Sequence, residues 1–265
     1  MTALSAEGLT IGYGAVTVTS GIDLALDAGS VTCLLGPNGV GKTTLFKTLL
    51  GLIPPLAGTV RIGGEALARL RPAAVARRVA YVPQAYPGDF AYSVLDLVVM
   101  GRTASLGAFA TPGQADLDIA LRALDALGIA ALAPRDSTRI SGGQRQLALI
   151  ARALAQQAGV VVMDEPTASL DLGNRLMVLD RIRALAGDGL AVLVSTHEPE
   201  HAFAVADQVA VLEPGGRFEA GPVDAVLTPD RLTRLYGVAL TVERTASGRS
   251  VVSPVCPNRG SQARP

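Results

Sequence analysis

A glycine-rich run near the N-terminus ends in a lysine and two threonines, a combination suited to binding phosphate. The run Gly36-Pro-Asn-Gly-Val-Gly-Lys42-Thr43 fits the pattern G-x-x-x-x-G-K-[ST]. It lies between a predicted buried strand and a predicted helix, a context that a chance glycine turn would not supply. Glycines let backbone N–H groups face phosphate oxygens, and the helix N-terminus favours negative charge. We expect nucleotide contacts from Gly36, Asn38, Gly39, Gly41, Lys42, Thr43 and Thr44, with Lys42 on the β- and γ-phosphates and Thr43 on Mg²⁺.

Two acids follow the apolar run 160–163, which has the character of a buried strand. A carboxylate at the carboxyl end of such a strand stands where ligands bind in parallel sheets, so Asp164 is expected to hold Mg²⁺ through water. Glu165 points another way along the chain and is suited to polarise an attacking water as a general base. Taken alone, the pair could simply cap the strand end, but the phosphate-binding loop favours the catalytic interpretation.

A second phosphate cradle is predicted at Ser141-Gly142-Gly143-Gln144, which opens a segment with helical apolar spacing over 143–157. One ATP has one γ-phosphate, and the upstream loop already accounts for it. The second cradle is therefore expected to serve the nucleotide of another copy of the chain. The alternative is a glycine-rich helix N-cap with no ligand.

The three elements together resemble the ATP-binding subunits of ABC transporters, over about residues 4–240, with Ile140 where the signature usually has leucine. The resemblance implies a head-to-tail homodimer in which each ATP lies between one P-loop and the partner's signature. It also implies roles for single residues: Gln84 sensing Mg²⁺ and water, His197 contacting the γ-phosphate, Asp171 of Ser169-Leu-Asp171 crossing the dimer interface, and Tyr13 stacking on adenine. A polar strand cap for His197 and a partly buried core tyrosine for Tyr13 are the alternatives.

The elements that position these residues predict an α/β fold with a P-loop, RecA-like parallel-sheet core, an antiparallel β subdomain and an inserted α-helical subdomain. Strands are expected at 9–18 and 22–26, and a βαβ unit over 160–194. Residues 1–240 form the expected nucleotide-binding domain, with the helical subdomain inserted at about 85–157. Residues 241–265 are expected to add one strand and a loose tail after about Val251.

Composition limits the possible partners. The 23 basic and 23 acidic residues balance, which argues against nucleic-acid binding because that usually requires a basic face. No basic stretch precedes an apolar run near residue 1, so we expect no secretion signal, and the apolar runs fall short of the roughly 18–20 residues that span a bilayer. Cys33 and Cys256 are expected to be unpaired thiols. We expect a peripheral protein at the cytoplasmic face of the inner (plasma) membrane, attached through a partner.

The segment Val94–Arg102, ending in Met-Gly-Arg, resembles importers of iron-siderophores, haem and cobalamin, whereas 143–152 and 197–202 are similar to molybdate and tungstate importers. The implied function is an ATP-hydrolysing subunit that drives uptake of a metal chelate or oxyanion. The implied partners are polytopic permease subunits, docked by a coupling helix near Gln84 and Val94–Arg102, and indirectly a substrate-binding protein. The alternatives are a soluble ABC ATPase acting as a clamp or scaffold, and a P-loop kinase active as a monomer.

Overall fold

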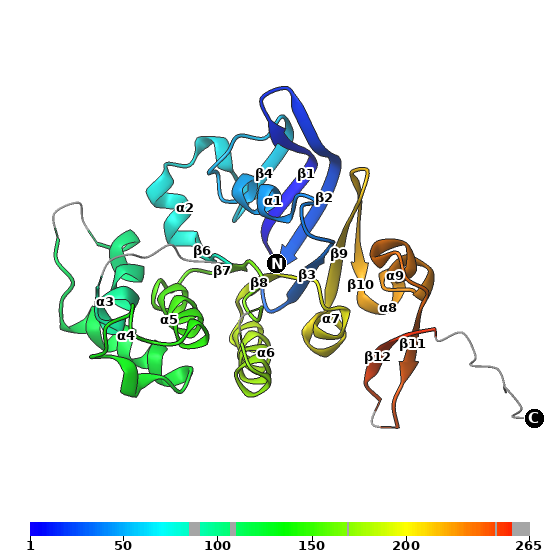
Figure 1. Ribbon diagram of the computed structural model, residues 1–265. Helices are drawn as coiled ribbons and strands as arrows, with labels where there is room; N and C mark the ends of the chain where they lie inside the picture. Colours follow the sequence, from blue (N-terminus) through cyan, green and yellow to red (C-terminus); the bar gives the residue numbers. More distant parts are fainter. Residues whose placement is uncertain (85–90, 107–109, 169, 247, 256–265) are drawn as a thin grey trace, which may run out of the picture.

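The computed structural model describes residues 1–265 except 85–90, 107–109, 169, 247 and 256–265. Its centre is a six-stranded sheet (Figure 1). The strands lie in the order β10 (Arg217–Pro222), β9 (Gln208–Glu213), β3 (Val31–Leu35), β8 (Ala191–Thr196), β7 (Val160–Met163) and β6 (Val79–Val82). All neighbouring pairs are parallel except β9 and β10. The carboxyl ends of β3, β6, β7 and β8 therefore meet at one edge of this sheet.

A second, antiparallel sheet is formed near the N-terminus by β2 (Val16–Asp27), β1 (Thr2–Tyr13), β4 (Ala57–Ile62) and β5 (Glu65–Ala66). The predicted strand over 9–18 is wrong, because the chain reverses within it. Tyr13 pairs with Val16 across a tight turn in which Gly14 has a φ of 57°. A left-handed backbone of this kind suits glycine, and the hairpin turn falls there.

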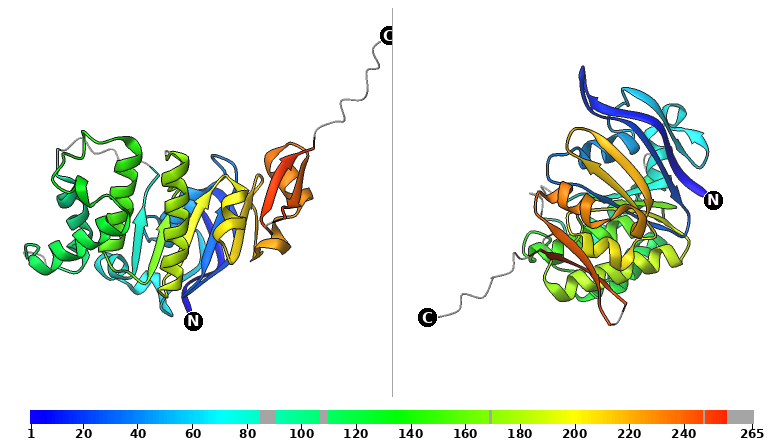
Figure 2. Two further views of the ribbon diagram at one scale, coloured as in Figure 1. Left: turned by 90° about the horizontal axis from the view of Figure 1, so that it is seen from below. Right: turned by 90° about the vertical axis from the view of Figure 1, so that its right-hand side faces the viewer.

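Helices cover the sheets and connect their strands. In chain order they are α1 (Lys42–Leu49), η1 (Leu67–Arg69), α2 (Pro72–Arg78), α3 (Val94–Val99), η2 (Met100–Ala104), α4 (Gln114–Ala126), η3 (Ala130–Leu132), α5 (Gly142–Ala155), α6 (Leu172–Gly187), α7 (Pro199–Val205), α8 (Val223–Val226) and α9 (Pro229–Tyr236), where η marks a 3₁₀ helix. Helices α3, α4 and α5 gather into a helical region at one end of the molecule, beyond β6 and β7 (Figures 1 and 2). This arrangement confirms the predicted α/β fold class.

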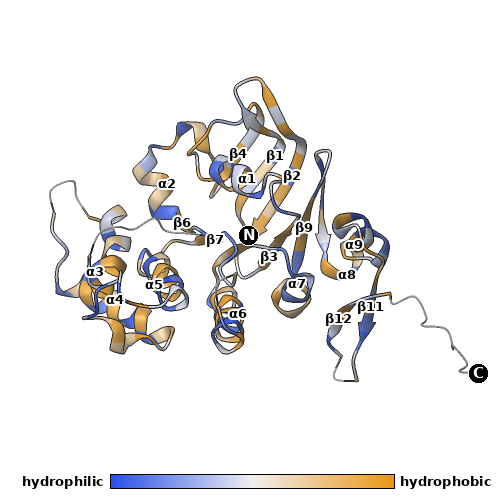
Figure 3. Cartoon of the chain, in the orientation of Figure 1, coloured by the Kyte–Doolittle hydropathy of each residue, from blue (hydrophilic) through white to orange (hydrophobic). Residues whose placement is uncertain are grey.

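The central sheet separates two apolar cores, because its buried strands alternate side chains between two covered faces. In β3, Cys33 and Leu35 enter the core shared with α3–α7, whereas Leu34 enters the core shared with α1 and the antiparallel sheet. In β7, Val161 and Val162 divide in the same way. The surrounding helices carry both hydrophobic and hydrophilic residues along their length (Figure 3). Their buried apolar residues belong to these two cores. Burial raises the pKa of the Cys33 thiol to about 12.

The Met-Gly-Arg sequence has a structural role inside the helical region. Arg102 donates from Nε to Asp116 Oδ1 at 2.9 Å and from Nη1 to the Ala155 carbonyl at 2.8 Å, joining α4 to the end of α5. A Cβ on Gly101 would lie 2.1 Å from the carbonyl oxygen of Arg152, so only glycine permits this approach. The hydrogen bond from Arg102 is the main cause that holds the pKa of Asp116 below its ordinary value. The apolar residues of α3 itself are mostly buried, so this helix packs into the core of the helical region.

The chain after α9 forms a hairpin instead of one strand and a tail. Strand β11 (Leu240–Arg244) pairs with β12 (Ser250–Pro254) from Leu240 opposite Pro254 to Arg244 opposite Ser250. The prediction that the loose tail starts at about Val251 is therefore wrong, since 251–254 are paired strand residues. Residues 256–265 of the predicted tail, which include Cys256, lie outside the described residues. Among the helices that the structure describes, none is long and apolar enough to cross a membrane.

Candidate active site

The predicted chemical groups converge at the edge of the central sheet where β3, β6, β7 and β8 end. A cavity of about 310 Å³ is present there. Its lining consists of Asn38, Gly39, Gly41, Lys42, Thr43, Thr44, Gln84, Asp164 and Glu165. These residues come from the loop after β3, the start of α1, and the ends of β6 and β7. The parallel topology explains how segments more than a hundred residues apart form one site.

The glycine-rich loop needs its glycines for space as well as for backbone conformation. A Cβ at Gly36 would lie 2.6 Å from the carbonyl oxygen of Leu212, and one at Gly41 would lie 2.5 Å from Val18 Cγ1. Gly41 also has a φ of 116° and directly precedes α1. Side chains at these two positions would push the loop away from its neighbours. The loop therefore places the first N–H groups of α1 at the cavity, where they favour an anion.

Asp164 is fixed by hydroxyl groups on both of its carboxylate oxygens. Ser195 Oγ donates to Asp164 Oδ1 at 2.6 Å, and Thr43 Oγ1 donates to Oδ2 at 2.9 Å. The Asp164 residue is only 3% exposed. Burial and the Asp164 carboxylate together raise the pKa of the adjacent Tyr81 to about 12, so Tyr81 stays a neutral phenol. A hydroxyl and a carboxylate side by side form a hard oxygen donor set of the kind that Mg²⁺ prefers.

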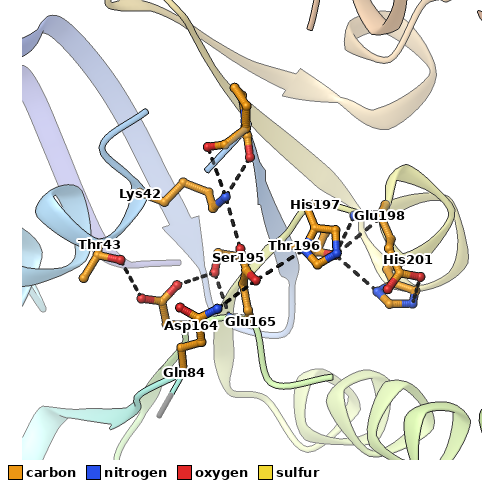
Figure 4. A network of polar contacts seen from close by, with 12 residues as sticks. Lys42, Thr43, Gln84, Asp164, Glu165, Ser195, Thr196, His197, Glu198 and His201 are labelled. Atoms are coloured by element: carbon orange, nitrogen blue, oxygen red, sulfur yellow. Dashed lines mark hydrogen bonds and ion pairs between the residues drawn. The ribbon is translucent and has the colours of Figure 1, made fainter. Parts of the chain in front are cut away.

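The carboxylate of Glu165 lies at the centre of the polar network (Figure 4). Lys42 Nζ is 3.2 Å from Oε1, Gln84 Nε2 donates to Oε2 at 3.1 Å, and His197 Nδ1 is 3.3 Å from Oε2. Lys42 also donates to the Gly36 carbonyl at 2.6 Å. The three polar side chains that surround this glutamate were each predicted as site residues from the sequence, and the structure brings them together around one carboxylate.

Glu165 also has a backbone conformation that is rare outside glycine. Its φ is 46°, in the left-handed region. Its N–H donates to Ser195 Oγ at 2.9 Å, which helps to hold this conformation. The left-handed turn redirects the chain after β7, so that Asp164 and Glu165, although consecutive, line the same cavity. Backbone strain of this kind clusters at functional sites.

Ser195 is a site residue that the sequence reasoning missed. It is fully buried at the end of β8 and links the backbone of Glu165 to the carboxylate of Asp164. The signal was a polar Ser-Thr pair directly after an apolar strand and directly before His197. Such a hydroxyl needs a buried partner, and the neighbouring strand β7 supplies one.

A second polar cluster supports the loop that carries His197. His201 Nδ1 is 3.2 Å from Thr196 Oγ1, and its Nε2 is 3.2 Å from Glu198 Oε2. Arg175, from the first turn of α6, donates to the same Glu198 oxygen at 3.1 Å. Burial is the main cause that lowers the pKa of His201 below its ordinary value of 6.5. The neutral Nε2–H tautomer fits these contacts, since it donates to Glu198 and accepts from Thr196.

The other predicted residues lie outside the lining of this cavity. Ser141 caps α5: its Oγ accepts from the N–H of Gln144 at 3.2 Å, and Gln144 Oε1 accepts from the N–H of Ser141. Gly142 and Gly143 form the first turn of this helix. Asp171 caps α6 by accepting from the N–H of Asn174 at 2.8 Å. Tyr13 is 49% exposed at the end of β1, and Ser169 lies outside the described residues.

The comparisons with known proteins agree with this geometry. Residues 19–168 match the ABC transporter family. An uncharacterized ABC transporter ATP-binding protein of Haemophilus influenzae is 44% identical over 88% of this chain and 89% of its own length. The molybdate import ATP-binding protein MolC of the same species is 38% identical over 88% of both chains. A solved inward-facing structure of a putative metal-chelate type ABC transporter aligns with a TM-score of 0.85 and 34% identity, covering 97% of this chain and 98% of its own.

Further relatives, between 35% and 39% identical, have names that specify cobalamin, hemin, manganese or zinc. The chain spans 65% of the length of the cobalamin relative from Halobacterium salinarum. These names share the description of an ATP-binding protein and differ in what is transported. The chain therefore belongs to the ABC transporter family, as one of its ATP-binding proteins, which are ATPases coupled to transport.

Proposed function

We propose that this chain is the ATP-hydrolysing subunit of an importer and closes as a head-to-tail homodimer on two ATP molecules. The observation that carries the proposal is the group of contacts around Glu165. A carboxylate that touches the P-loop lysine, Gln84 and His197 stands where an attacking water would meet a γ-phosphate. In this proposal residues 1–240 form the nucleotide-binding domain, with the helical subdomain inserted at about 85–157.

The loop 36–44 is proposed to hold the phosphates of ATP. Lys42 now divides its ammonium between Glu165 and the Gly36 carbonyl. On nucleotide binding it would turn to the β- and γ-phosphates and release the Glu165 carboxylate. Thr43, Asp164 and Gln84 have the oxygen atoms to hold Mg²⁺, which when bound would neutralise charge on the phosphate oxygens. Tyr13 would stack on adenine from the end of β1.

Glu165 is proposed to act as the general base. Freed from Lys42, its carboxylate would accept the proton of the attacking water as that water meets the γ-phosphate. Gln84, which follows β6, and His197, which follows β8, both contact Oε2 of Glu165 and would orient its carboxylate. His197 is 47% exposed at its side chain, so it is also free to contact the γ-phosphate.

The signature at Ser141–Gln144 is proposed to bind the γ-phosphate of the partner's ATP. The N–H groups of Gly142 and Gly143 lie in the first turn of α5, where a helix offers them no acceptor. They also lie outside the lining of the cavity that contains Lys42. Asp171 would cross the same interface beside Leu172 and Leu176, which are 69% and 52% exposed. ATP then favours the closed dimer, because only closure completes both phosphate sites.

An apolar groove is proposed to receive a cytoplasmic helix of a membrane permease. It has a volume of about 870 Å³ and is lined by residues of 50–55, 58–60, 66–72 and 75–81. Leu52 and Leu56 nearby are 64% and 39% exposed, so they add apolar surface next to the groove. Tyr81 lines the groove three residues before Gln84, so a docked helix would lie against the strand that leads to the Glu165 network. Val94–Arg102, expected to border the docking site, is absent from the described lining.

The proposed cargo is a metal chelate, such as an iron-siderophore, haem or cobalamin, or an oxyanion such as molybdate or tungstate. The names of the relatives and the metal-chelate type transporter support this range. A separate substrate-binding protein would select within it. The subunit would then work at the cytoplasmic face of the inner membrane, attached through its permease.

The test is a detergent pull-down of the tagged chain from its native membranes. A polytopic membrane protein recovered in stoichiometric amount supports the importer proposal and identifies the permease. Recovery of soluble partners only, with ATP-dependent dimerisation intact, would replace the proposal with a soluble ABC clamp or scaffold.

A further inference from the structure

The C-terminal segment contacts the loop that carries His197. We use the name C-terminal clamp for α9 (Pro229–Tyr236) together with strands β11 and β12. The phenol of Tyr236, the last residue of α9, donates to the backbone carbonyl of His197 at 2.9 Å. A second contact involves Glu200, in the first turn of α7. The N–H of Val252 in β12 donates to its Oε1 at 3.4 Å. The clamp therefore holds the His197 loop and the start of α7 at two points.

The clamp is itself fixed to the body of the protein. Leu232 and Leu235 of α9 are 0% and 4% exposed and belong to the core beneath the central sheet. Thr233 Oγ1 accepts from the N–H of Leu240 at 3.0 Å, which ties α9 to β11. Gly237 ends α9 in a left-handed conformation, with a φ of 70°. Tyr236 thus projects from a short, anchored helix and not from a free tail.

The chemistry of the contact suits a permanent donor. Burial, with the carboxylates of Glu200 and Glu198 nearby, raises the pKa of Tyr236 above its ordinary value of 10. The phenol therefore keeps its proton at any working pH and can always donate to the His197 carbonyl. On its other side, His197 reaches the Glu165 carboxylate through Nδ1. A single residue thus separates the Tyr236 hydroxyl from the proposed general base.

We propose that Tyr236 is a positioning residue for ATP hydrolysis, which fixes the backbone of His197 so that its ring meets Glu165 and the γ-phosphate. The inference rests on the proposed role of His197. Tyr236 would act through the histidine and would not touch the nucleotide. It gives the C-terminal clamp a share in catalysis, although the clamp lies outside the cavity that holds the P-loop.

The test is steady-state ATP hydrolysis by the full chain with Tyr236→Phe, which removes one hydroxyl. Loss of one neutral hydrogen bond is expected to lower kcat by about 3- to 10-fold. The KM for ATP should stay unchanged, since the P-loop contacts are untouched. The matched control is Thr233→Val, which removes a hydrogen bond inside the same clamp and should keep wild-type kcat. A wild-type kcat for Y236F, or an equal fall in both variants, would overturn the inference.

A double-mutant cycle separates this inference from the proposed function. If Tyr236 acts through the histidine, Y236F should add no further loss of kcat to H197A. Independent, multiplicative losses would refute positioning through His197 while leaving the role of His197 intact. If H197A alone kept wild-type kcat, the proposed role of His197 would be refuted. The inference about Tyr236 would then be refuted as well.

Discussion

At the scale of single residues, the proposed chemistry depends most on Glu165. Its carboxylate contacts Lys42, Gln84 and His197, and its backbone takes a left-handed conformation that few residues adopt. The ion pair between Lys42 and Glu165 links the phosphate-binding loop to the proposed base. Because nucleotide phosphate would compete for Lys42, ATP binding and release of the base are expected to be the same event.

Glu165→Gln should slow hydrolysis by about 10²- to 10⁴-fold, because the amide cannot take the proton from water. ATP should still bind, and somewhat more tightly than to wild type, because the phosphate-binding loop is unchanged and the amide no longer competes for Lys42. Single-turnover hydrolysis and equilibrium binding of a fluorescent ATP analogue measure the two quantities. Glu7→Gln is the control, because Glu7 is exposed and its 3.9 Å contact with Arg61 is remote from the site. A wild-type rate for E165Q would refute the assignment of the base.

His201 should make stability depend on pH. Burial lowers its pKa below 6.5, so the folded protein holds the neutral imidazole while the unfolded chain gains a proton as the pH falls through about 6.5. The unfolded state then binds more protons, and the free energy of unfolding falls with falling pH. Urea unfolding at pH 7.5 and 5.5 should show a larger loss for wild type than for His201→Gln, up to about 1.4 kcal/mol per pH unit. Equal losses would contradict this.

The sequence predicted the residues of this network but not how they are held. A P-loop, paired acids and a histidine after a strand are recognisable by residue type and spacing. Ser195 and Tyr236 are not, because their partners are a carboxylate on another strand and a backbone carbonyl 39 residues away. Hydrogen bonds between distant segments depend on sheet order and helix placement, which local sequence patterns do not specify.

At the scale of elements, the Met-Gly-Arg sequence shows how a motif can support a function indirectly. Gly101 and Arg102 fasten the start of the helical region to α5, the helix that begins with the signature. Any docked partner that moves the helical region would move α5 with it. The buried residues of the motif therefore serve the packing between the helical region and α5.

Gly101→Ala should destabilise the protein by about 1–3 kcal/mol, because a Cβ would lie 2.1 Å from the carbonyl oxygen of Arg152 and force α5 away. Denaturant unfolding measures this loss. Gly159→Ala is the matched control, since nothing lies within 4 Å of its Cβ position, and it should change stability by less than about 0.5 kcal/mol. Similar values for the two variants would show that the close contact carries no strain.

A segment with a strong apolar period was predicted within two residues at each end, as α5 illustrates: the expected range was 143–157 and the helix spans Gly142–Ala155. The hairpin of β1 and β2 was divided wrongly because apolar residues continue up to its turn on both sides. Strand β12 was missed because Ser250–Pro254 is short and rich in serine and proline, and its structure depends on pairing with β11. Pairing partners override weak local preference in strands.

At the scale of the whole molecule, two surfaces point to partners. The signature and the P-loop cavity belong to separate parts of one chain, which is consistent with a site completed by a second copy. The groove is lined by Leu52 and Tyr81, and Tyr81 stands three residues before Gln84, which lines the P-loop cavity. If a membrane subunit docks in this groove, as proposed, strand β6 would lead from its docking site to Gln84 and the Glu165 carboxylate.

Leu52→Glu should abolish recovery of a membrane partner in the pull-down, because it places a charge in the apolar groove, and it should leave ATP affinity unchanged. Leu121→Glu is the control: Leu121 is an exposed apolar residue of α4, 39% exposed and outside the groove lining. Loss of the partner in both variants, or in neither, would show that the groove is not the docking site.

The central claim is that two copies of this chain close on ATP, and the mass of E165Q in solution tests it most directly. Light scattering coupled to size-exclusion chromatography should give 27.2 kDa without nucleotide and twice that mass with Mg²⁺ and ATP. With Ser141→Arg added to E165Q, the mass should stay at 27.2 kDa in the presence of Mg²⁺ and ATP, since the arginine would block the signature of each copy. A species of 27.2 kDa that binds ATP and never doubles in mass would contradict the account.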